Sequence, residues 1–246
     1  MADQLGERAK NDLCLEVMGR RDWLVWHHSD RVCRLAELLV IRPEFADRAV
    51  DRAALRAAAL YHDAGWVLQV RQGELDARDI LLRPTTDLQR QLAADWMRVQ
   101  LKGLLAPASL EAAARAILFL NDRRTELLEA QVLAEADNLD SIGPHTIELM
   151  VRRLTAEGKT LADLVKAWER QEEYHYWQTR IKEGFRFDPV RALAEQRWQA
   201  LRQFMYHLRQ AVRLEDLTGV ANPQGPNTAQ HGAVVLPVQH QHHKNQ

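Results

Sequence analysis

An adjacent histidine and aspartate close an alanine-rich stretch in the first third of the chain. Residues 53–60 are apolar apart from one arginine, and residues 60–66 read Leu-Tyr-His-Asp-Ala-Gly-Trp. A helix that needed only a packed core would carry leucine or alanine at the His62 and Asp63 positions, because a buried carboxylate is costly unless it is paired or bound to a metal. We therefore expect His62 and Asp63 to be two ligands of one metal ion, with the other ligands supplied from elsewhere in the chain.

A third ligand is predicted from the spacing of apolar residues near the N-terminus. Residues 22–41 predict the first long helix, whose apolar face advances in steps of four, four, three and four residues. That face consists of Leu24, His28, Val32, Leu35 and Leu39. His28 thus lies on the side that faces the core, whereas His27 points about 100° away. The helix geometry therefore selects His28 as the candidate ligand.

A fourth ligand comes from a helix predicted over residues 125–138. Asp137 follows Leu133 by four residues and therefore shares its apolar face. Two imidazoles and two carboxylates form a mixed nitrogen and oxygen donor set, which suits Mn, Fe, Co, Ni, Zn or, less well, Mg. Such an ion lowers the pKa of a bound water and neutralises charge on a phosphoryl oxygen. The pattern therefore predicts chemistry at phosphorus.

Three segments that carry these residues have a recognisable order. They read His-Ser-Asp-Arg-Val at residues 28–32, Tyr-His-Asp-Ala-Gly at residues 61–65 and Glu-Ala-Asp-Asn-Leu-Asp-Ser-Ile-Gly at residues 135–143. Residues 22–153 thereby resemble the HD-domain superfamily of metal-dependent phosphohydrolases, whose signature is a histidine, a His-Asp pair and a later aspartate on an all-helical fold. The resemblance implies four metal ligands, namely His28, His62, Asp63 and Asp137. It makes Asp140 a neighbour of the ligands rather than a ligand.

The resemblance also implies a single divalent ion, of unspecified identity. Superfamily members that hold two metals have extra histidines between the His-Asp pair and the last aspartate, whereas no histidine lies between His62 and His145 here. No lysine follows the pair, and no Gly-Tyr-Pro occurs in the chain. These differences argue against the branch that hydrolyses cyclic dinucleotides.

Three further residues are candidates for contact with a substrate. Arg31, one turn from the candidate ligand on its helix, either clamps a phosphate or forms a surface ion pair with Asp30 or Glu37. Asn121 either rims the pocket or lies in a solvated turn. His145 is either a proton donor near the metal or a surface histidine at the start of a helix.

Aromatic residues gather in the C-terminal half. They are Trp168, Tyr174, Tyr176, Trp177, Phe185 and Phe187. Such residues either stack on a nucleotide base or pack one helix against another, and helix packing is the favoured interpretation.

Periodicity and helix breakers predict the remaining elements. Helices are expected over residues 9–18, 22–41, 51–64, 87–101, 109–120, 125–138, 160–182 and 189–214. Gly65 is expected to stop the third helix, Ser109 and Thr125 to act as N-caps, and residues 67–86 to form a loop with at most a short helix in it. No strand is expected.

The predicted fold class is all-α: an HD-domain-like helical bundle with additional long C-terminal helices and a disordered C-terminal tail. Residues 1–217 are expected to form one domain, with a metal-binding core over residues 22–153 and a helical extension over residues 154–217. Residues 218–246 are rich in glycine, proline and polar residues, which predicts the disordered tail. The long helices are expected either to cover the pocket or to mediate a homodimer.

Composition excludes several classes of partner. The formal net charge of −1 lacks the basic excess of a nucleic-acid-binding protein. No run approaches the ~18 apolar residues of a membrane span, and the polar residues 1–11 predict no signal peptide. Two cysteines, Cys14 and Cys33, form no Cys-x-x-Cys motif, which fits a reducing cytoplasm.

The expected function is metal-dependent hydrolysis of a small phosphorylated compound, with a nucleotide as the expected class. Asp63 is the expected catalytic residue, because it holds the ion that activates the attacking water, and Arg31 is the first candidate for binding the phosphate. Two rival functions stay open. One is a non-catalytic metal-binding or signalling module, and the other is a helical scaffold in which the His-Asp pair belongs to an ion-pair network.

Overall fold

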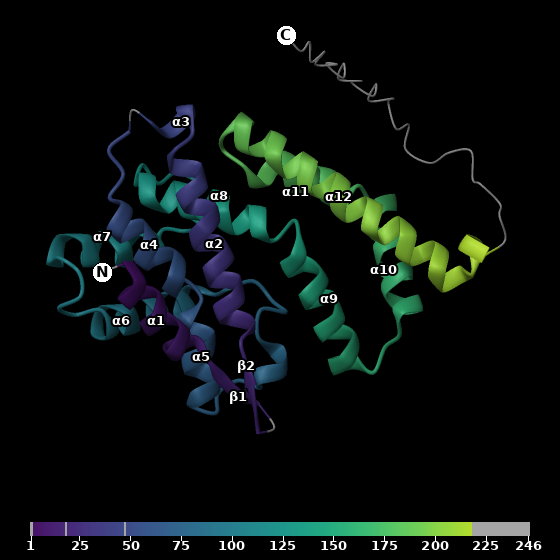
Figure 1. Ribbon diagram of the computed structural model, residues 1–246, viewed down its shortest axis with the longest axis horizontal. Coiled ribbons are helices and arrows are strands. Elements are labelled where there is room, and N and C mark those ends of the chain that lie inside the picture. Colours follow the sequence, from purple (N-terminus) through teal and green to yellow (C-terminus); the bar gives the residue numbers. More distant parts are fainter. Residues whose placement is uncertain (1, 18, 47, 218–246) are drawn as a thin grey trace, which may run out of the picture.

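Helices make up most of the structure, a computed structural model that describes residues 2–17, 19–46 and 48–217 (Figure 1). The first helices are α1 (Ala2–Leu13), α2 (Leu24–Val40), α3 (Pro43–Ala46), α4 (Arg52–Tyr61), α5 (Ala64–Arg71), α6 (Asp87–Gln100), α7 (Pro107–Leu118) and α8 (Leu128–Asp140). They are followed by α9 (Pro144–Glu157), α10 (Leu161–Glu173), α11 (Tyr176–Gly184) and α12 (Asp188–Arg213). Short 3-10 turns lie at Ala77–Asp79 and Glu215–Leu217, and the strands β1 (Leu15–Val17) and β2 (Arg20–Asp22) pair antiparallel. The predicted all-α class is confirmed.

Helix α4 lies at the centre of the N-terminal bundle, in contact with α2, α7 and α8. Its carboxylate cap is Asp51, whose side chain accepts hydrogen bonds from the backbone of Ala53 and Ala54, both at 3.0 Å. From Ala57 to Tyr61 every side chain is buried, and four of the five are small or aliphatic. Small side chains let neighbouring helices approach closely, so the alanine-rich helix delivers His62 and Asp63 to a point where several helices meet.

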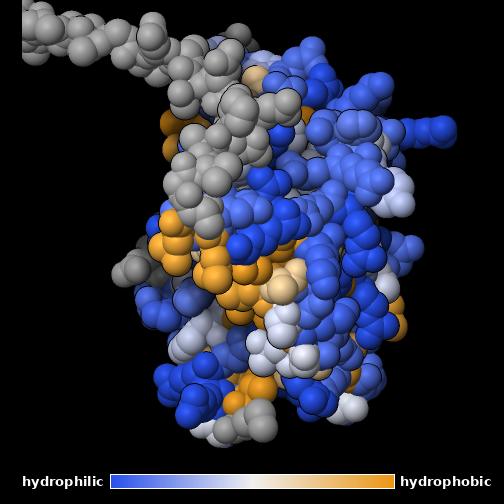
Figure 2. Space-filling view, turned by 90° about the vertical axis from the view of Figure 1, so that its right-hand side faces the viewer, coloured by the Kyte–Doolittle hydropathy of each residue, from blue (hydrophilic) through white to orange (hydrophobic). Residues whose placement is uncertain are grey.

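The C-terminal helices form a second group beside this bundle (Figure 1). Helix α9 leads away from the end of α8, and α10, α11 and α12 pack against one another, with α12 also touching α8. Seen from the side of these helices, apolar side chains gather in the middle of the surface among hydrophilic ones (Figure 2). Among the described residues, none of the helices has both the length and the apolar character of a membrane span. The division of the domain at residue 153 stays a prediction.

Gly65 does not stop a helix, contrary to the prediction. Helix α4 ends before His62, and Gly65 is the second residue of α5, which occupies part of the expected loop. A Cβ atom on Gly65 would lie 2.0 Å from the backbone oxygen of Gln89 near the start of α6. The glycine therefore serves the close contact between α5 and α6, which no local sequence signal distinguishes from a helix stop.

Helix boundaries near the N-terminus and around α7 also differ from the predictions. Helix α1 ends at Leu13, and the strand hairpin that follows was not expected; Gly19, at φ 73°, lies in its turn. Ser109 lies inside α7, because Pro107 occupies its first turn, where the missing N–H carries no penalty. Helix α8 begins at Leu128, so Thr125 is not its N-cap.

The long helix predicted over residues 160–182 is divided in two. His175 adopts a left-handed conformation, with φ 52°, between α10 and α11. A histidine gives no sequence signal for such a break, since glycine or asparagine is the usual residue there. The predicted disordered tail, residues 218–246, lies outside the described residues.

Replacing Gly65 by alanine is expected to lower the free energy of unfolding by about 3 kcal/mol, because the added methyl group meets backbone that cannot move aside alone. Urea denaturation measures the change. The matched control is Gly184→Ala, where nothing lies within 4 Å of the added Cβ. Equal stability of the two variants would contradict the close-contact role of Gly65.

Candidate metal centre

Two buried histidines from different helices meet at one point. His28 lies on α2 and His62 directly follows α4, and their Nε2 atoms are 3.2 Å apart. The Nδ1 atom of His62 lies 2.9 Å from the carbonyl oxygen of Ala59, which can only accept a hydrogen bond. His62 therefore carries a proton on Nδ1, and its Nε2 atom faces His28.

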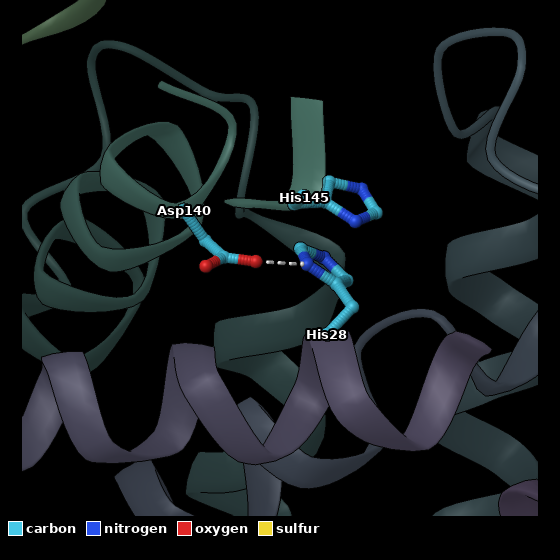
Figure 3. Close-up of side chains that lie close together, drawn as sticks. All are labelled: His28, Asp140 and His145. Atoms are coloured by element: carbon cyan, nitrogen blue, oxygen red, sulfur yellow. Dashed lines mark hydrogen bonds and ion pairs between the residues drawn. The ribbon is translucent and has the colours of Figure 1, made fainter. Parts of the chain in front are cut away.

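Asp140 fixes the ring of His28 in the same way. Its Oδ2 atom lies 2.8 Å from Nδ1 of His28 (Figure 3). The carboxylate is fully buried and also accepts a hydrogen bond from Nε of Arg31 at 2.9 Å. A carboxylate behind a ligand histidine sets its tautomer and ring orientation. Asp140 thus leaves the Nε2 atom of His28 directed at the same point as that of His62.

Two carboxylates complete the cluster. The Oδ2 atom of Asp63 lies 3.4 Å from Nε2 of both histidines. The Oδ1 atom of Asp137 lies 3.3 Å from Nε2 of His28 and 3.8 Å from Nε2 of His62. The other oxygen of Asp63 accepts a hydrogen bond from Oγ1 of Thr85 at 2.8 Å, which holds the carboxylate in place. The four residues predicted as ligands are therefore brought together.

The donor set fits a metal ion. With their Nδ1 protons held by Asp140 and Ala59, His28 and His62 direct Nε2 at the two carboxylates, so four ligand atoms face a point that only a proton or a metal ion can fill. Four acceptors that face one point repel one another unless a cation lies between them. Metal–ligand bonds of about 2.0–2.2 Å place neighbouring ligand atoms about 3 Å apart, close to the separations found here. Assignment of these four residues as ligands remains a prediction that this geometry supports.

Carboxylates also control the protonation of the cluster. Burial lowers the pKa of His28, but hydrogen bonds to Asp137, Asp140 and Asp63 outweigh burial and raise that pKa well above its ordinary value. The pKa of His62 is raised too, because Asp63 and Asp137 outweigh the effect of burial. Burial opposes ionisation of Asp63 and Asp137, yet the two histidines hold both carboxyl pKa values below the usual range. The site thus favours a positive charge among ionised carboxylates.

The centre lies at the base of a cavity of about 490 Å³. His28, Asp63 and Asp137 line it, whereas His62 lies behind them. Side chains from both helical groups form the rest of the wall, and four of them are arginines. These are Arg83, Arg90, Arg153 and Arg180. Three of them pair with carboxylates, Arg83 with Asp79, Arg90 with Asp87 and Arg153 with Glu157, whereas Arg180 has no carboxylate partner among the described residues.

Two of the three predicted substrate contacts, Asn121 and His145, line the cavity, and the third, Arg31, does not. Asn121 lines the cavity. His145 also lines it and is buried, so the surface alternative was wrong for this residue; its ring stacks on that of His28 with centroids 4.1 Å apart (Figure 3). Arg31 is not among the lining residues, and it pairs with Asp140 and Glu148 rather than with the expected surface partners. Burial and the neighbouring His28 lower the pKa of His145.

The sequence did not reveal Thr85 or the role of Asp140 as the partner of His28. Thr85 lies 22 residues from Asp63 in a segment read as a loop. Asp140 follows Asp137 by three residues on α8. This spacing places both side chains on one face of the helix, and it was the sequence signal that could have indicated a role for Asp140 at the centre.

Comparison with known proteins identifies this arrangement. The family model of the HD domain matches residues 25–142. Residues 25–142 form an HD domain. HD domains are generally metal-dependent hydrolases that bind divalent ions. The matched residues include the four that converge here, His28, His62, Asp63 and Asp137. No curated protein matches the sequence.

The fold extends beyond the HD domain to the C-terminal helices. The crystal structure of Bacillus subtilis YpgQ shares 19% identity, over 89% of this chain and 97% of that chain, with a TM-score of 0.52. The crystal structure of YpgQ in complex with ADP shares 20% identity, over 89% and 96% of the two chains, with a TM-score of 0.54. Identity at this level shows a common fold that includes the helices after the HD domain.

Asp140→Asn is expected to weaken metal binding about 10- to 100-fold, although Asp140 is not a candidate ligand, because His28 loses the carboxylate that orients it. Titration calorimetry with Mn²⁺ measures the affinity. The control Asp95→Asn removes an exposed carboxylate paired with Arg98. An unchanged affinity in Asp140→Asn would show that Asp140 does not support the centre.

Metal affinity is expected to rise with pH between about pH 6 and pH 8, because protons and metal compete for the same Nε2 atoms. The raised pKa of both histidines keeps imidazolium present to a higher pH than usual, so metal binding must displace protons. Calorimetry in two buffers of different ionisation enthalpy counts the protons released. Affinity that is independent of pH, with no proton release, would contradict the geometry described.

Proposed function

We propose that this HD domain is a metal-dependent phosphohydrolase whose substrate is a small phosphorylated compound of the nucleotide class. The observation that carries the proposal is the opening of a four-acceptor centre onto a cavity lined by four arginines. A cavity of about 490 Å³ has the size of a small-ligand site. Guanidinium groups around such a cavity favour an anionic ligand, and arginine binds phosphate through paired N–H donors.

Support for a nucleotide comes from the neighbour of similar fold. YpgQ has been crystallised in complex with ADP. This chain covers 96% of that protein at 20% identity, so the ADP complex supports a class of ligand and does not specify a base. The base and the number of phosphates stay outside the proposal.

One divalent ion would be held by His28, His62, Asp63 and Asp137. When bound, it supplies charge neutralisation at a phosphoryl oxygen and a water of lowered pKa. The residues of the chain do the rest. Asp63 is the proposed catalytic residue, because its carboxylate is ionised, lines the cavity and is held in position by Thr85. Asp137 is more open to the cavity than Asp63, since 33% of its side chain is exposed against 6% for Asp63.

Substrate contacts are assigned to residues that line the cavity. Asn121 offers an amide on the cavity wall, and the ring of His145 lies beside His28. Arg90 is buried in the wall, where it donates to the backbone oxygen of Thr85 at 2.7 Å and pairs with Asp87. Arg31 is held by Asp140 and Glu148. The cavity arginines Arg83, Arg90 and Arg153 also pair with carboxylates, those of Asp79, Asp87 and Glu157. Arg180, which has no carboxylate partner among the described residues, therefore replaces Arg31 as the proposed phosphate contact.

Asp63→Ala is expected to lose both bound metal and turnover, because it removes one ligand and leaves three. Elemental analysis of protein purified without a nickel column gives the metal content, and phosphate release from a panel of nucleotides with added Mn²⁺ gives turnover. Asp30→Asn is the control, since Asp30 pairs with Arg34 on the surface of α2. Full metal content in Asp63→Ala would contradict the ligand set.

The same screen separates the proposed enzyme from its rival. Wild-type protein that holds one metal per chain and releases phosphate from none of the phosphorylated compounds would favour the non-catalytic module. Turnover that requires metal and disappears in Asp63→Ala would favour the phosphohydrolase.

A further inference from the structure

The hydroxyl of Thr85 joins two residues of the segment that carries the His-Asp pair. Nε1 of Trp66 donates to Oγ1 of Thr85 at 3.0 Å, and Oγ1 donates to Oδ1 of Asp63 at 2.8 Å. Trp66 follows Asp63 by three residues, whereas Thr85 lies 22 residues from it. The three side chains therefore form a chain of hydrogen bonds that ends on a candidate ligand of the metal.

The donors and acceptors of this chain fix its direction. An indole N–H can only donate, and a hydroxyl has a single hydrogen atom. Because the oxygen of Thr85 accepts from Trp66, its hydrogen is directed at Asp63. Thr85 lines the cavity, but its one hydrogen is already engaged there. Thr85 therefore acts on Asp63 rather than as a donor to a molecule in the cavity.

The contact gives the two oxygens of Asp63 different roles. Oδ1 accepts the hydrogen bond from Thr85, and Oδ2 lies 3.4 Å from Nε2 of both His28 and His62. The last torsion of an aspartate side chain is broad, so a carboxylate without such an anchor turns readily. The hydroxyl therefore decides which oxygen faces the centre.

Helix packing brings the two ends of the chain together. Trp66 lies on α5, and Thr85 lies just before α6. The missing side chain of Gly65 lets α6 approach α5, since an added Cβ would lie 2.0 Å from the backbone oxygen of Gln89. The backbone oxygen of Thr85 also accepts from Nη1 of Arg90 at 2.7 Å. Close packing of α5 on α6 is thus what places the hydroxyl beside Asp63.

Burial strengthens these hydrogen bonds. Trp66 is 2% exposed and Asp63 4%. A hydrogen bond to a carboxylate is stronger than one between neutral groups, and water competes little with it in a buried site. A buried tryptophan needs some acceptor for its N–H. Here that acceptor is the one hydroxyl that holds Asp63, so the contact reaches the metal centre.

We infer, on the basis of the metal centre in the proposed function, that Thr85 and Trp66 are positioning residues of that centre. Trp66 orients the hydroxyl of Thr85, and the hydroxyl holds Oδ1 of Asp63 so that Oδ2 is presented to the ion. Since Thr85 also lines the cavity, it links the position of the cavity wall to the position of a metal ligand.

Thr85→Val keeps the shape of the side chain and removes the hydroxyl. It is expected to weaken Mn²⁺ binding to the full chain about 10- to 100-fold, because Asp63 loses its anchor. Thr85→Ser restores the hydroxyl and is expected to bind Mn²⁺ within about 3-fold of wild-type protein. Trp66→Phe keeps a buried ring and is expected to weaken binding about 3- to 10-fold, the effect of one neutral hydrogen bond. Titration calorimetry measures all three affinities.

Two matched variants control for the loss of the same groups elsewhere. Thr155→Val removes an exposed hydroxyl that donates to the carbonyl oxygen of Val151 on α9. Trp198→Phe removes an indole N–H on α12, from a residue that is not among those lining the cavity. Both are expected to bind Mn²⁺ as wild-type protein does. Thermal midpoints of the metal-free variants verify folding.

The indole N–H of Trp66 gives a readout that a purely structural role would not change. In protein labelled with ¹⁵N-tryptophan, its NMR signal is assigned by its loss in Trp66→Phe. Saturating Zn²⁺ is expected to shift this signal in wild-type protein, because a cation at Asp63 polarises both hydrogen bonds. In Thr85→Val the chain is broken, and the signal is expected to stay nearly unmoved.

The outcomes separate this inference from the proposed function. Unchanged Mn²⁺ affinity in Thr85→Val, or equal Zn²⁺-induced shifts in Thr85→Val and wild-type protein, would overturn the inference and leave the proposed function standing. Wild-type protein that binds no Mn²⁺ would overturn both. The expected affinities and shifts, found in a protein that hydrolyses no phosphorylated compound, would support the positioning roles and contradict the phosphohydrolase alone.

Discussion

The structure depends on four ligand atoms being held together at a point that only a cation, a proton or a metal ion, can fill. Nε2 of His28 and of His62 lie 3.2 Å apart, and carboxylate oxygens of Asp63 and Asp137 lie within 3.8 Å of them. Such a cluster is unfavourable unless a cation occupies its centre. The fold keeps it in place through three contacts behind the ligands, made by the carbonyl of Ala59, the carboxylate of Asp140 and the hydroxyl of Thr85. The fold itself therefore sets the positions of the ligand atoms.

Asp140 connects this centre to the C-terminal helices. Besides His28 it contacts Arg31, and the guanidinium of Arg197 on α12 lies 3.9 Å from its Oδ1 atom. Arg197 also donates to the carbonyl oxygen of Ile142 at 3.1 Å, beside Gly143, where an added Cβ would collide with the guanidinium. The segment that follows α8 thus joins the HD domain to α12. This physical link explains why the cavity has walls from both groups of helices.

Local sequence patterns were sufficient for the parts of the site that obey helix geometry. The spacing along α2 selected the buried His28 over the exposed His27, and the spacing along α8 placed Asp137 beside an apolar face. Features that depend on contacts distant in sequence were missed. Gly65 was interpreted as a helix stop, because its contact with the backbone of Gln89 cannot be seen in the local sequence. The left-handed conformation of His175 has no local sequence signal either. The arginines and aromatic residues of the cavity wall converge only in the folded chain, so the substrate side of the site was beyond prediction from periodicity.

The central claim is that His28, His62, Asp63 and Asp137 hold one cation. Anomalous diffraction from a crystal of this protein grown with Mn²⁺ tests it most directly. The geometry predicts one strong peak within about 2.0–2.3 Å of Nε2 of both histidines and of an oxygen from each aspartate. The account would be contradicted if the centre had no peak in a crystal that binds Mn²⁺ elsewhere. It would also be contradicted by a peak that lies beyond bonding distance of Asp63 or of Asp137.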